Sequence, residues 1–433
     1  MSFIRPRIYP YSSKIKGTKL TRNSPIEVFP DPKTVYISTS QHIGAPAIPV
    51  VNAGDYVKKG QLIAEANGLI SSNIYASVSG TVREITKITN GLGQTTDHII
   101  IDNDFTNETV DLPPLEDYSA PSLIERVRLA GIVGLGGAGF PTAVKLTPKN
   151  KLDTLVINGA ECEPYLTCDF RLMLEKTDEI YRGIKYVASA LGISNIVMGI
   201  ELNKPEAIEL FSRYTDFTIV KLKKKYPMGS EKQLIYCTTG RKVPTGKMPF
   251  DVGCCVQNIK TLLACYEAIE KNKPLTHSVI TVSGKGLKNP KNLLVPVGTP
   301  YTELIEYCGG FSADTIKIVA GGPMMGKALI TLNQFTKKAD SGVLCVRDCD
   351  TQIQPPANCI NCGKCAKNCP MRLMPMYIES FYQAGNYKEA ERYGAMNCLE
   401  CGLCAYNCPA KRALVQSISV AKLKIKEMHA NGK

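Results

Sequence analysis

The sequence lacks a long apolar run and has no apolar core segment near its start. Its uncharged stretch GIVGLGGAGFPTAV, residues 131–144, is too short and too rich in glycine to span a bilayer. The first 24 residues carry six basic side chains and no acidic one, without the apolar segment of a secretion signal. With 433 residues, the chain is long enough for three or four domains. We therefore expect a multidomain cytoplasmic protein without a transmembrane segment.

The sequence also lacks motifs for binding nucleic acid, although its net charge is +13. Basic residues are spread along the chain, and no recognition helix, zinc finger or aromatic RNA-binding motif accompanies them. Such residues commonly form solvated faces, and an acidic protein partner or anionic lipid headgroups are the next interpretation. We expect no nucleic-acid partner.

A carrier lysine is missing from a segment that otherwise has the pattern of a carrier domain. Residues 31–105, which follow a basic arm at residues 1–30, contain short strand patterns separated by turn glycines. The pair VNAGDYVKKGQLIAEA and IYASVSGTVREI resembles the two halves of a biotinyl or lipoyl carrier, a flattened barrel-sandwich fold. No lysine lies between Gly60 and Gly80, where such carriers need one. We expect the fold without the swinging-arm function.

The middle of the chain predicts two further modules. Residues 106–275 alternate β-rich runs such as DTLVINGA with helical stretches such as DEIYRGIKYVASALG, which is typical of a Rossmann-like α/β domain with a mostly parallel sheet. Residues 276–345 contain strand patterns with one short helix and resemble a β-grasp module that binds soluble ligands. The fold class is therefore multidomain, α/β combined with β.

In contrast to the absent signals above, the chain is rich in cysteine. Seventeen cysteines without an export signal indicate metal-bound thiolates rather than disulfides. The motif C-x2-C-x2-C-x3-C-P occurs twice within residues 346–433, and its spacing is typical of paired [4Fe–4S] clusters in which the fourth cysteine of each motif serves the other cluster. The predicted ligands are Cys359, Cys362, Cys365 and Cys408 for one cluster, and Cys369, Cys398, Cys401 and Cys404 for the other. Paired zinc sites are the alternative, although this spacing does not favour them.

The remainder of this segment is expected to be helical. The spacer MYIESFYQAGNYKEAERYGAM predicts a helical ferredoxin-type domain rather than a compact β-rich one. A last helix places an apolar stripe on one face, which favours packing within the protein over a membrane anchor. The stripe comprises Leu414, Ile418, Ala421, Ile425 and Met428. The other nine cysteines lack ligand spacing, and we expect them to be buried or idle thiols.

A glycine-rich segment upstream, GIVGLGGAGFPTAVK, is suited to holding a phosphate. Gly134, Gly136, Gly137 and Gly139 allow close approach of backbone N–H groups, and Lys145 adds a positive charge. The segment alone is weak evidence, because glycine-rich turns are common and no clear strand precedes it. The motifs INGAECEPYLTCD, YPMGSEKQL and GKMPFDVGCCVQNIKT follow in order.

Together these four motifs resemble the flavin- and NADH-binding subunit of respiratory complex I. The resemblance implies that Gly134, Gly136 and Lys145 hold the FMN phosphate, with Gly137 and Gly139 in the same loop. It implies that the flavin is lined by Asn158, Glu161, Gly229, Gln257, Asn258 and Thr261. It implies that the nicotinamide nucleotide is faced by Phe140, Glu163, Glu231, Lys247 and Phe250. Ala160, Ser230 and Gln257 depart from the family pattern, which affects individual flavin contacts rather than the fold.

The order of modules over nearly the whole chain resembles the C subunits of Rnf complexes, which exchange electrons between ferredoxin and NAD and move Na+ or H+. This resemblance implies a peripheral oxidoreductase subunit at the cytoplasmic face of the plasma membrane, with FMN, NAD(H) and two [4Fe–4S] clusters. Its implied partners are the iron–sulfur B subunit, the membrane subunits and, indirectly, ferredoxin. A cobalamin reductase of the propanediol-utilisation type and a non-enzymatic iron–sulfur relay are the alternatives.

Overall fold

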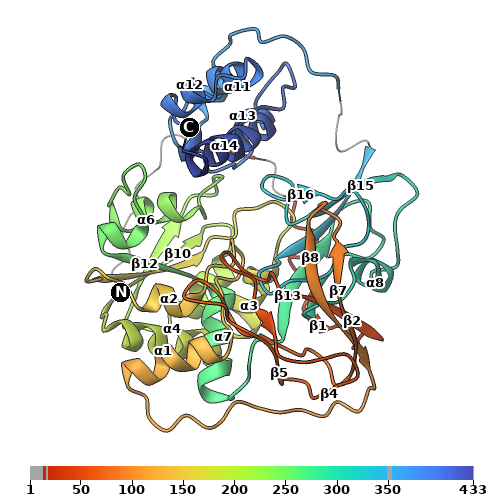
Figure 1. Ribbon diagram of the computed structural model, residues 1–433. Helices are drawn as coiled ribbons and strands as arrows, with labels where there is room; N and C mark the ends of the chain where they lie inside the picture. The colour runs from red at the N-terminus through yellow and green to blue at the C-terminus, as the bar shows by residue number, and fades with distance from the viewer. Residues whose placement is uncertain (1–12, 16–17, 349–353, 433) are drawn as a thin grey trace.

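The computed structural model describes residues 13–15, 18–348 and 354–432. Four sheets and a helical C-terminal lobe divide the described chain into the four kinds of module that the sequence predicts. In Figure 1 the α/β domain lies to the left, two β-rich modules lie to the right, and the C-terminal lobe lies above them. The predicted fold class is confirmed.

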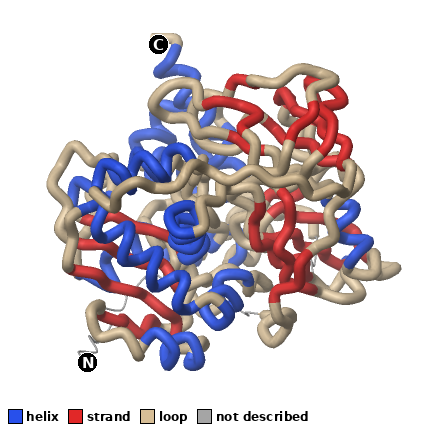
Figure 2. Tube along the Cα trace, turned by 90° about the horizontal axis from the view of Figure 1, so that it is seen from below, coloured by secondary structure: helices blue, strands red, loops and turns tan. Residues whose placement is uncertain are grey.

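The α/β domain is built on a parallel sheet in the order β11-β10-β9-β12. Its strands are β9 (Thr154–Gly159), β10 (Asn195–Glu201), β11 (Thr218–Leu222) and β12 (Cys254–Asn258). Its helices are α1 (Ala120–Leu129), α2 (Thr142–Leu146), α3 (Cys168–Glu175), α4 (Thr177–Leu191), α5 (Pro205–Phe211), α6 (Glu231–Thr239) and α7 (Ile259–Glu270), with a 3-10 turn η1 (Pro249–Val252). Figure 2 shows these strands side by side with helices packed against them.

Alternating side chains give this sheet two apolar faces. Leu155 and Ile157 of β9 belong to a core shared with α1, α3, α4, α5 and α7, whereas Val156 belongs to a second core with α6. Both faces are buried, as expected for a parallel sheet covered by helices. Gly183 lets α4 cross close to α7, because a Cβ there would lie 2.0 Å from the Leu262 carbonyl oxygen. The sheet is therefore held rigidly, and its carboxyl edge is free to carry a site.

The barrel-sandwich domain consists of two small sheets around one core. One sheet has the order β2-β8-β7-β4 and the other β3-β5-β6. The strands are β2 (Thr34–Ser38), β3 (Ile48–Pro49), β4 (Tyr56–Val57), β5 (Leu62–Glu65), β6 (Ile74–Tyr75), β7 (Gly80–Thr89) and β8 (Thr95–Asn103). The turn between β5 and β6 occupies the place of the missing carrier lysine, and Leu69 at its tip is 80% exposed.

The β-grasp module contains a six-stranded mixed sheet in the order β1-β14-β13-β17-β15-β16. The strands are β13 (His277–Ser283), β14 (Lys291–Pro296), β15 (Thr315–Ala320), β16 (Lys327–Ala328) and β17 (Gly342–Arg347), with helix α8 (Tyr301–Tyr307). Strand β1 (Ile26–Val28) comes from the predicted N-terminal arm and pairs in parallel with β14. The arm is thus partly built into this sheet.

The C-terminal lobe is helical, as the cysteine spacing and the spacer predict. Its elements are α10 (Lys364–Lys367), α11 (Pro375–Gln383), α12 (Tyr387–Arg392), the 3-10 turn η2 (Ala395–Asn397), α13 (Leu403–Tyr406) and α14 (Leu414–Ala430). Four residues of the predicted stripe on α14 are buried, namely Leu414, Ile418, Ala421 and Ile425. Ile418 and Ile425 belong to a core with residues of α11 and α12, so the stripe packs within the protein. Among the described residues, no helix is long and apolar enough to cross a membrane.

Candidate functional site at the carboxyl edge of the sheet

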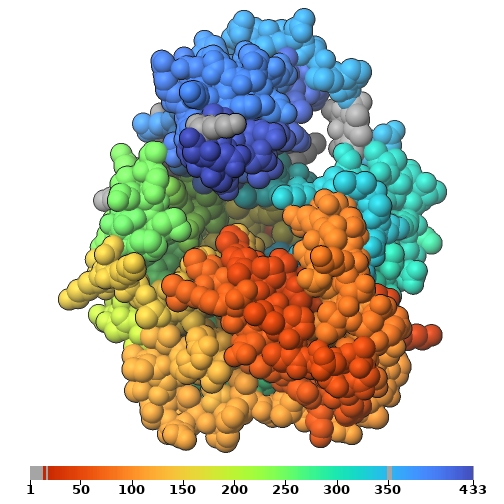
Figure 3. Space-filling model, in the orientation of Figure 1, coloured from red at the N-terminus to blue at the C-terminus, as the bar shows by residue number. Residues whose placement is uncertain are grey.

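Several predicted flavin residues meet at the carboxyl edge of the parallel sheet. Asn258 is the last residue of β12 and Asn158 the penultimate residue of the neighbouring β9, and the two lie directly opposite each other in the register. The glycine-rich loop, defined here as residues 131–141, packs on this edge, because the Leu135 amide donates a 3.0 Å hydrogen bond to Thr261 Oγ1. The carboxyl edge is where ligands bind in open α/β sheets. Figure 3 shows a hollow in this region, between the C-terminal lobe, the α6 region and the barrel-sandwich domain.

The glycine-rich loop is closed at its base and open at its tip. The Gly134 amide donates a 2.8 Å hydrogen bond to the Phe140 carbonyl oxygen, and Gly136 and Gly139 have φ of +78° and +71°. A Cβ at Gly136 would lie 3.3 Å from Asn258 Nδ2, whereas a Cβ at Gly137 would meet nothing within 4 Å. The tip therefore offers exposed backbone next to the strand ends, which fits the phosphate of a flavin nucleotide.

A cation and a second backbone segment border the same edge. Lys145 on α2 places Nζ 3.3 Å from Glu231 Oε1 and 3.4 Å from the Val256 carbonyl oxygen. Asn158 Nδ2 donates a 2.9 Å hydrogen bond to the Gly229 carbonyl oxygen. The structure thus brings Gly229 and Glu231 to the strand ends, although they lie about 70 residues farther along the chain than Asn158. The donors and the open glycine tip together fit FMN.

The two predicted glutamates after β9 are engaged with backbone amides. Glu161 accepts hydrogen bonds from the amides of Asp169 (2.8 Å) and Phe170 (3.3 Å) at the start of α3, and burial raises its pKa to about 7. Glu163 Oε1 accepts hydrogen bonds from the amides of Met324 (2.6 Å) and Met325 (3.0 Å), and burial raises its pKa as well. Both carboxylates thus tie the loop after β9 to neighbouring segments.

The remaining predicted residues lie outside the group of hydrogen-bonded residues described above. Gln257 is 2% exposed and lies on β12 with its amide nitrogen 3.6 Å from Cys255 Sγ. Phe140 is partly buried at the base of the glycine-rich loop. Lys247 and Phe250 lie in the exposed segment before β12, and Phe250 is 41% exposed. Apart from the buried Gln257, these residues are at least partly accessible to solvent.

The eight motif cysteines line two separate pockets in the C-terminal lobe. The outer pocket is lined by Cys359, Cys362, Cys365 and Cys408, and the inner pocket by Cys369, Cys398, Cys401 and Cys404. Each pocket therefore takes three thiols from one motif and the fourth from the other. Four thiols per pocket are the donor set of a [4Fe–4S] cluster.

Backbone conformation repeats between the two motifs. Asn361 and Glu400 have the same positive φ of 54°, and Gly363 and Gly402 have φ of 69° and 77°. These left-handed residues turn the chain between successive cysteines, so that the thiols point to one side. Amide donors also reach sulfur, since the Leu373 amide lies 3.3 Å from Cys369 Sγ and the Glu400 amide 3.3 Å from Cys398 Sγ. Such hydrogen bonds are a feature of iron–sulfur sites, and the pockets fit the clusters.

The inner pocket faces the α/β domain. Cys401 is buried in a cluster with Tyr226 and Leu403, against which Ile15 and Cys162 pack. Cys162 follows Glu161 directly, and its Sγ accepts a 3.3 Å hydrogen bond from the Gly229 amide. In contrast, Cys359 and Cys362 of the outer pocket are exposed. The two pockets therefore differ in their surroundings, with one next to the sheet edge and one open to solvent.

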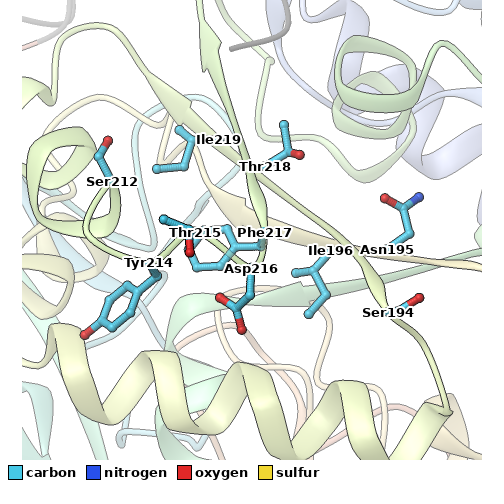
Figure 4. Close-up of a pocket in the computed structure, with 10 residues that line it drawn as sticks. All are labelled: Ser194, Asn195, Ile196, Ser212, Tyr214, Thr215, Asp216, Phe217, Thr218 and Ile219. Carbon is cyan, nitrogen blue, oxygen red and sulfur yellow. The ribbon is translucent and has the colours of Figure 1, made fainter. Parts of the chain in front are cut away.

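Another depression lies at the opposite edge of the sheet, and its one carboxylate is already paired with side chains of α4. It has a volume of about 250 Å³ and lies where β10 and β11 begin (Figure 4). The Asp216 carboxylate in it accepts hydrogen bonds from the Tyr181 hydroxyl (3.0 Å) and from Lys185 Nζ (2.6 Å). The carboxylate of this depression is therefore already paired, and none of the predicted site residues lines it.

Sequence reasoning missed several residues that support the site. Lys19 Nζ donates hydrogen bonds to the carbonyl oxygens of Glu161 (3.0 Å), Glu163 (3.0 Å) and Leu166, and so holds the loop after β9. Asn258 Nδ2 donates a 2.7 Å hydrogen bond to Asp169, which lies in a predicted motif but had no assigned role. No local pattern distinguishes Lys19 from the other basic residues of the arm.

Family models match the chain over all four modules. Residues 127–267 match the Nuo51 FMN-binding domain and residues 10–106 the RnfC barrel sandwich hybrid domain. Residues 279–328 match the SLBB domain and residues 358–412 the 4Fe–4S dicluster domain. These matches confirm FMN and iron–sulfur clusters as the cofactors that the sequence predicts.

The fold and the two kinds of site define an iron–sulfur flavoprotein of the oxidoreductase class. The chain is 45% identical over 429 residues to the C subunit of the proton-translocating ferredoxin:NAD(+) oxidoreductase complex of Clostridium ljungdahlii, covering 96% of this chain and 93% of that protein. It is 41% identical over 416 residues to the Na(+)-translocating counterpart of Acetobacterium woodii, covering 94% of each. The chain belongs to the family of C subunits of Rnf-type ion-translocating oxidoreductase complexes.

A solved structure supports the fold. The chain is similar to an NAD+-reducing [NiFe]-hydrogenase in the H2-reduced state, with a TM-score of 0.50 and 17% identity. The similarity covers 74% of this chain and 70% of that one. At this identity the likeness concerns the arrangement of the chain, which agrees with the flavin-binding module and its neighbours.

Proposed function

We propose that this chain is the peripheral subunit that exchanges electrons between NAD(H) and the iron–sulfur partners of an Rnf-type complex. Its relatives are named as ferredoxin:NAD(+) oxidoreductase subunits, which favours this role over the cobalamin reductase alternative. The observation that carries the proposal is the contact between the two sites. Gly229 at the sheet edge is hydrogen-bonded to Cys162, and Cys162 packs in the cluster that contains Cys401 of the inner pocket.

The residues at the sheet edge have separate tasks in this proposal. Gly134 and Gly136 shape the loop that receives the FMN phosphate, and Lys145 supplies a positive charge beside it. Bound there, the flavin would exchange a hydride with a nicotinamide and single electrons with iron–sulfur clusters. No general acid or base is needed for hydride transfer, which depends on positioning. The side chains of Asn158 and Asn258 are held by hydrogen bonds and give the edge a fixed shape.

A second set of predicted residues is proposed to receive the nicotinamide nucleotide, namely Phe140, Glu231, Lys247 and Phe250. Phe140 and Phe250 offer aromatic faces at the base of the loop and on the exposed segment before β12. Glu231 and Lys247 offer charges for hydroxyl and phosphate groups. Glu163 can contact the nucleotide only if its carboxylate gives up its hydrogen bonds to the amides of Met324 and Met325.

The two pockets lie at different places relative to the sheet edge and the solvent. The inner pocket adjoins the sheet edge, and the outer pocket presents Cys359 and Cys362 to solvent, with Ile360 between them 66% exposed. Lys364 and Lys411 flank the outer pocket in the sequence, so its surroundings are basic. We propose this face for docking an acidic iron–sulfur partner protein of the complex. Attachment to the cytoplasmic face of the membrane would then go through such partners.

The test uses the full chain, reconstituted anaerobically with iron, sulfide and FMN. We expect about eight irons and one flavin per chain, as for two cubane clusters and one FMN, and NADH should bleach the flavin band and produce the EPR signals of reduced clusters. Cys401→Ala should abolish reduction of the outer cluster by NADH while dithionite still reduces it. Cys359→Ala is the matched control, since the inner cluster should still accept electrons from NADH. A wild-type chain that binds FMN and clusters, yet shows no cluster reduction under excess NADH, would contradict the proposal.

A further inference from the structure

A fully buried lysine lies where three of the modules meet. Lys338, between β16 and β17 of the β-grasp module, is 1% exposed. Its Nζ donates hydrogen bonds to the carbonyl oxygens of Asn73 and of Gly131 (2.8 Å). Asn73 belongs to the barrel-sandwich turn, and Gly131 begins the glycine-rich loop. No described carboxylate forms an ion pair with Lys338, and burial lowers the pKa of its amino group to about 7. The two carbonyl oxygens are therefore the groups that stabilise this buried amino group.

The segment around Lys338 also supports the tip of the glycine-rich loop. The Gly136 amide donates a 3.3 Å hydrogen bond to the carbonyl oxygen of Ala339. Lys260 Nζ fixes this segment from the other side, with donor distances of 2.8 Å to the Asp340 carbonyl oxygen and 2.9 Å to Ser341 Oγ. The loop that is expected to hold a phosphate therefore rests on residues 338–341.

The barrel-sandwich domain contacts the loop at both ends. At Gly131, with φ of +66°, a Cβ would lie 2.3 Å from the Asn73 carbonyl oxygen. At Gly139, a Cβ would lie 3.2 Å from the Gln41 carbonyl oxygen and from His42 Cα. Gln41 also accepts a 3.0 Å hydrogen bond from the Lys338 amide through Oε1. Glycine at these two positions allows a close approach that a side chain would prevent.

We propose that Lys338 is a positioning residue for the flavin phosphate, which ties the glycine-rich loop to the barrel-sandwich domain. This inference rests on the proposed function. It assigns a role to a domain that has the fold of a carrier but no carrier lysine: the domain braces the loop from outside the α/β domain. The Lys338 amino group keeps both of its carbonyl acceptors only while the loop and the turn are in place, so the loop is held before any ligand arrives.

The test compares FMN with riboflavin, which lacks the phosphate. The full chain is loaded with clusters, depleted of flavin, and titrated with each flavin by fluorescence quenching. For Lys338→Met we expect the Kd for FMN to rise about tenfold, as for the loss of the two hydrogen bonds that hold the loop. The Kd for riboflavin should change by less than about twofold, because the isoalloxazine contacts remain. Hydrogen exchange of residues 131–141 in the flavin-free chain should become faster.

Lys337→Met is the matched control. Lys337 is the adjacent residue and also reaches the barrel-sandwich domain, with Nζ 3.2 Å from the Ser40 carbonyl oxygen, but it makes no hydrogen bond to the loop. Both Kd values should stay near those of the wild type. If Lys338→Met does not accumulate in folded form, Gln41→Leu provides the second variant, with a smaller loss of the same kind.

The possible outcomes separate the inference from the proposed function. Equal loss of FMN and riboflavin in Lys338→Met or Gln41→Leu means that Lys338 only maintains the fold, and the inference is wrong. Unchanged FMN binding in these variants also overturns it. A wild-type chain that binds neither flavin refutes the proposed function instead. Selective loss of FMN in the Lys338 or Gln41 variant, with the Lys337 control unchanged, supports the inference.

Discussion

Replacement of Lys19 by methionine should loosen the loop after β9 without unfolding the rest of the chain. The Lys19 side chain is 15% exposed, and its ammonium serves three carbonyl groups of residues 161–166. Loss of one hydrogen bond of this kind costs about 1 kcal/mol net, so Lys19→Met should lower the local free energy of opening by about 3 kcal/mol. That corresponds to roughly a hundredfold faster exchange of amides that open locally.

The size of this effect should depend on pH through Glu161. Burial raises the pKa of Glu161 to about 7, and the nearby Lys19 lowers it, with Nζ 3.8 Å from Oε2. A carboxyl group whose pKa is raised in the folded state stabilises the fold below its ordinary pKa, and this stabilisation is lost as pH rises through about 7. At pH 6 the variant loses only the carbonyl contacts. At pH 8 Glu161 is ionised, and the variant also loses the cation beside it. This loss lowers the local free energy of opening by about a further 1 kcal/mol after screening.

Hydrogen exchange followed by mass spectrometry measures both effects. Peptides covering residues 161–175 should exchange faster in Lys19→Met than in the wild type, with the larger difference at pH 8 after correction for intrinsic rates. Lys176→Met is the control, because Lys176 is half exposed and pairs with Glu179 on the surface. The reasoning is refuted if exchange accelerates equally throughout the chain, or if the difference is larger at pH 6.

Three further changes test other parts of the structure. Gly183→Ala should destabilise the α/β domain by about 3 kcal/mol, because its Cβ would overlap the Leu262 carbonyl oxygen, and a lower thermal transition would show this. Arg412→Met removes a cation that lines the outer pocket, so an EPR-monitored redox titration should find that cluster's potential lowered by roughly 50 mV. Glu163→Ala should speed exchange of the turn at residues 322–326 by about tenfold or more, whereas Glu163→Gln keeps an acceptor and should have a smaller effect. An unchanged transition, potential or exchange rate would contradict the corresponding contact.

The modules and the meeting of the flavin motifs could be predicted because their signals are local. The apolar β-rich run DTLVINGA indicated β9, and the two four-cysteine motifs specify their own turns. The carboxyl ends of parallel strands necessarily share an edge, so Asn158 and Asn258 came together as the fold class implies. The residue roles at that edge remain predictions, which the flavin titrations and the reduction by NADH test.

The supporting contacts could not be predicted, because they join segments that are distant in sequence. Glu163 bonds to Met324, which is 161 residues away, and Lys338 bonds to Asn73, which is 265 residues away. In the sequence both lysines, Lys19 and Lys338, resemble the other basic residues of a chain with net charge +13. Their burial is decided by how the modules dock, and no periodicity within one module encodes it.

The sharing of cysteines between the two motifs has a consequence for assembly. Because each pocket takes thiols from both motifs, each metal centre links the beginning of the lobe to its end. A chain cut after residue 397 would lose three donors of one centre and the last donor of the other. We therefore expect proteolytic cleavage between the two motifs to inactivate both centres at once.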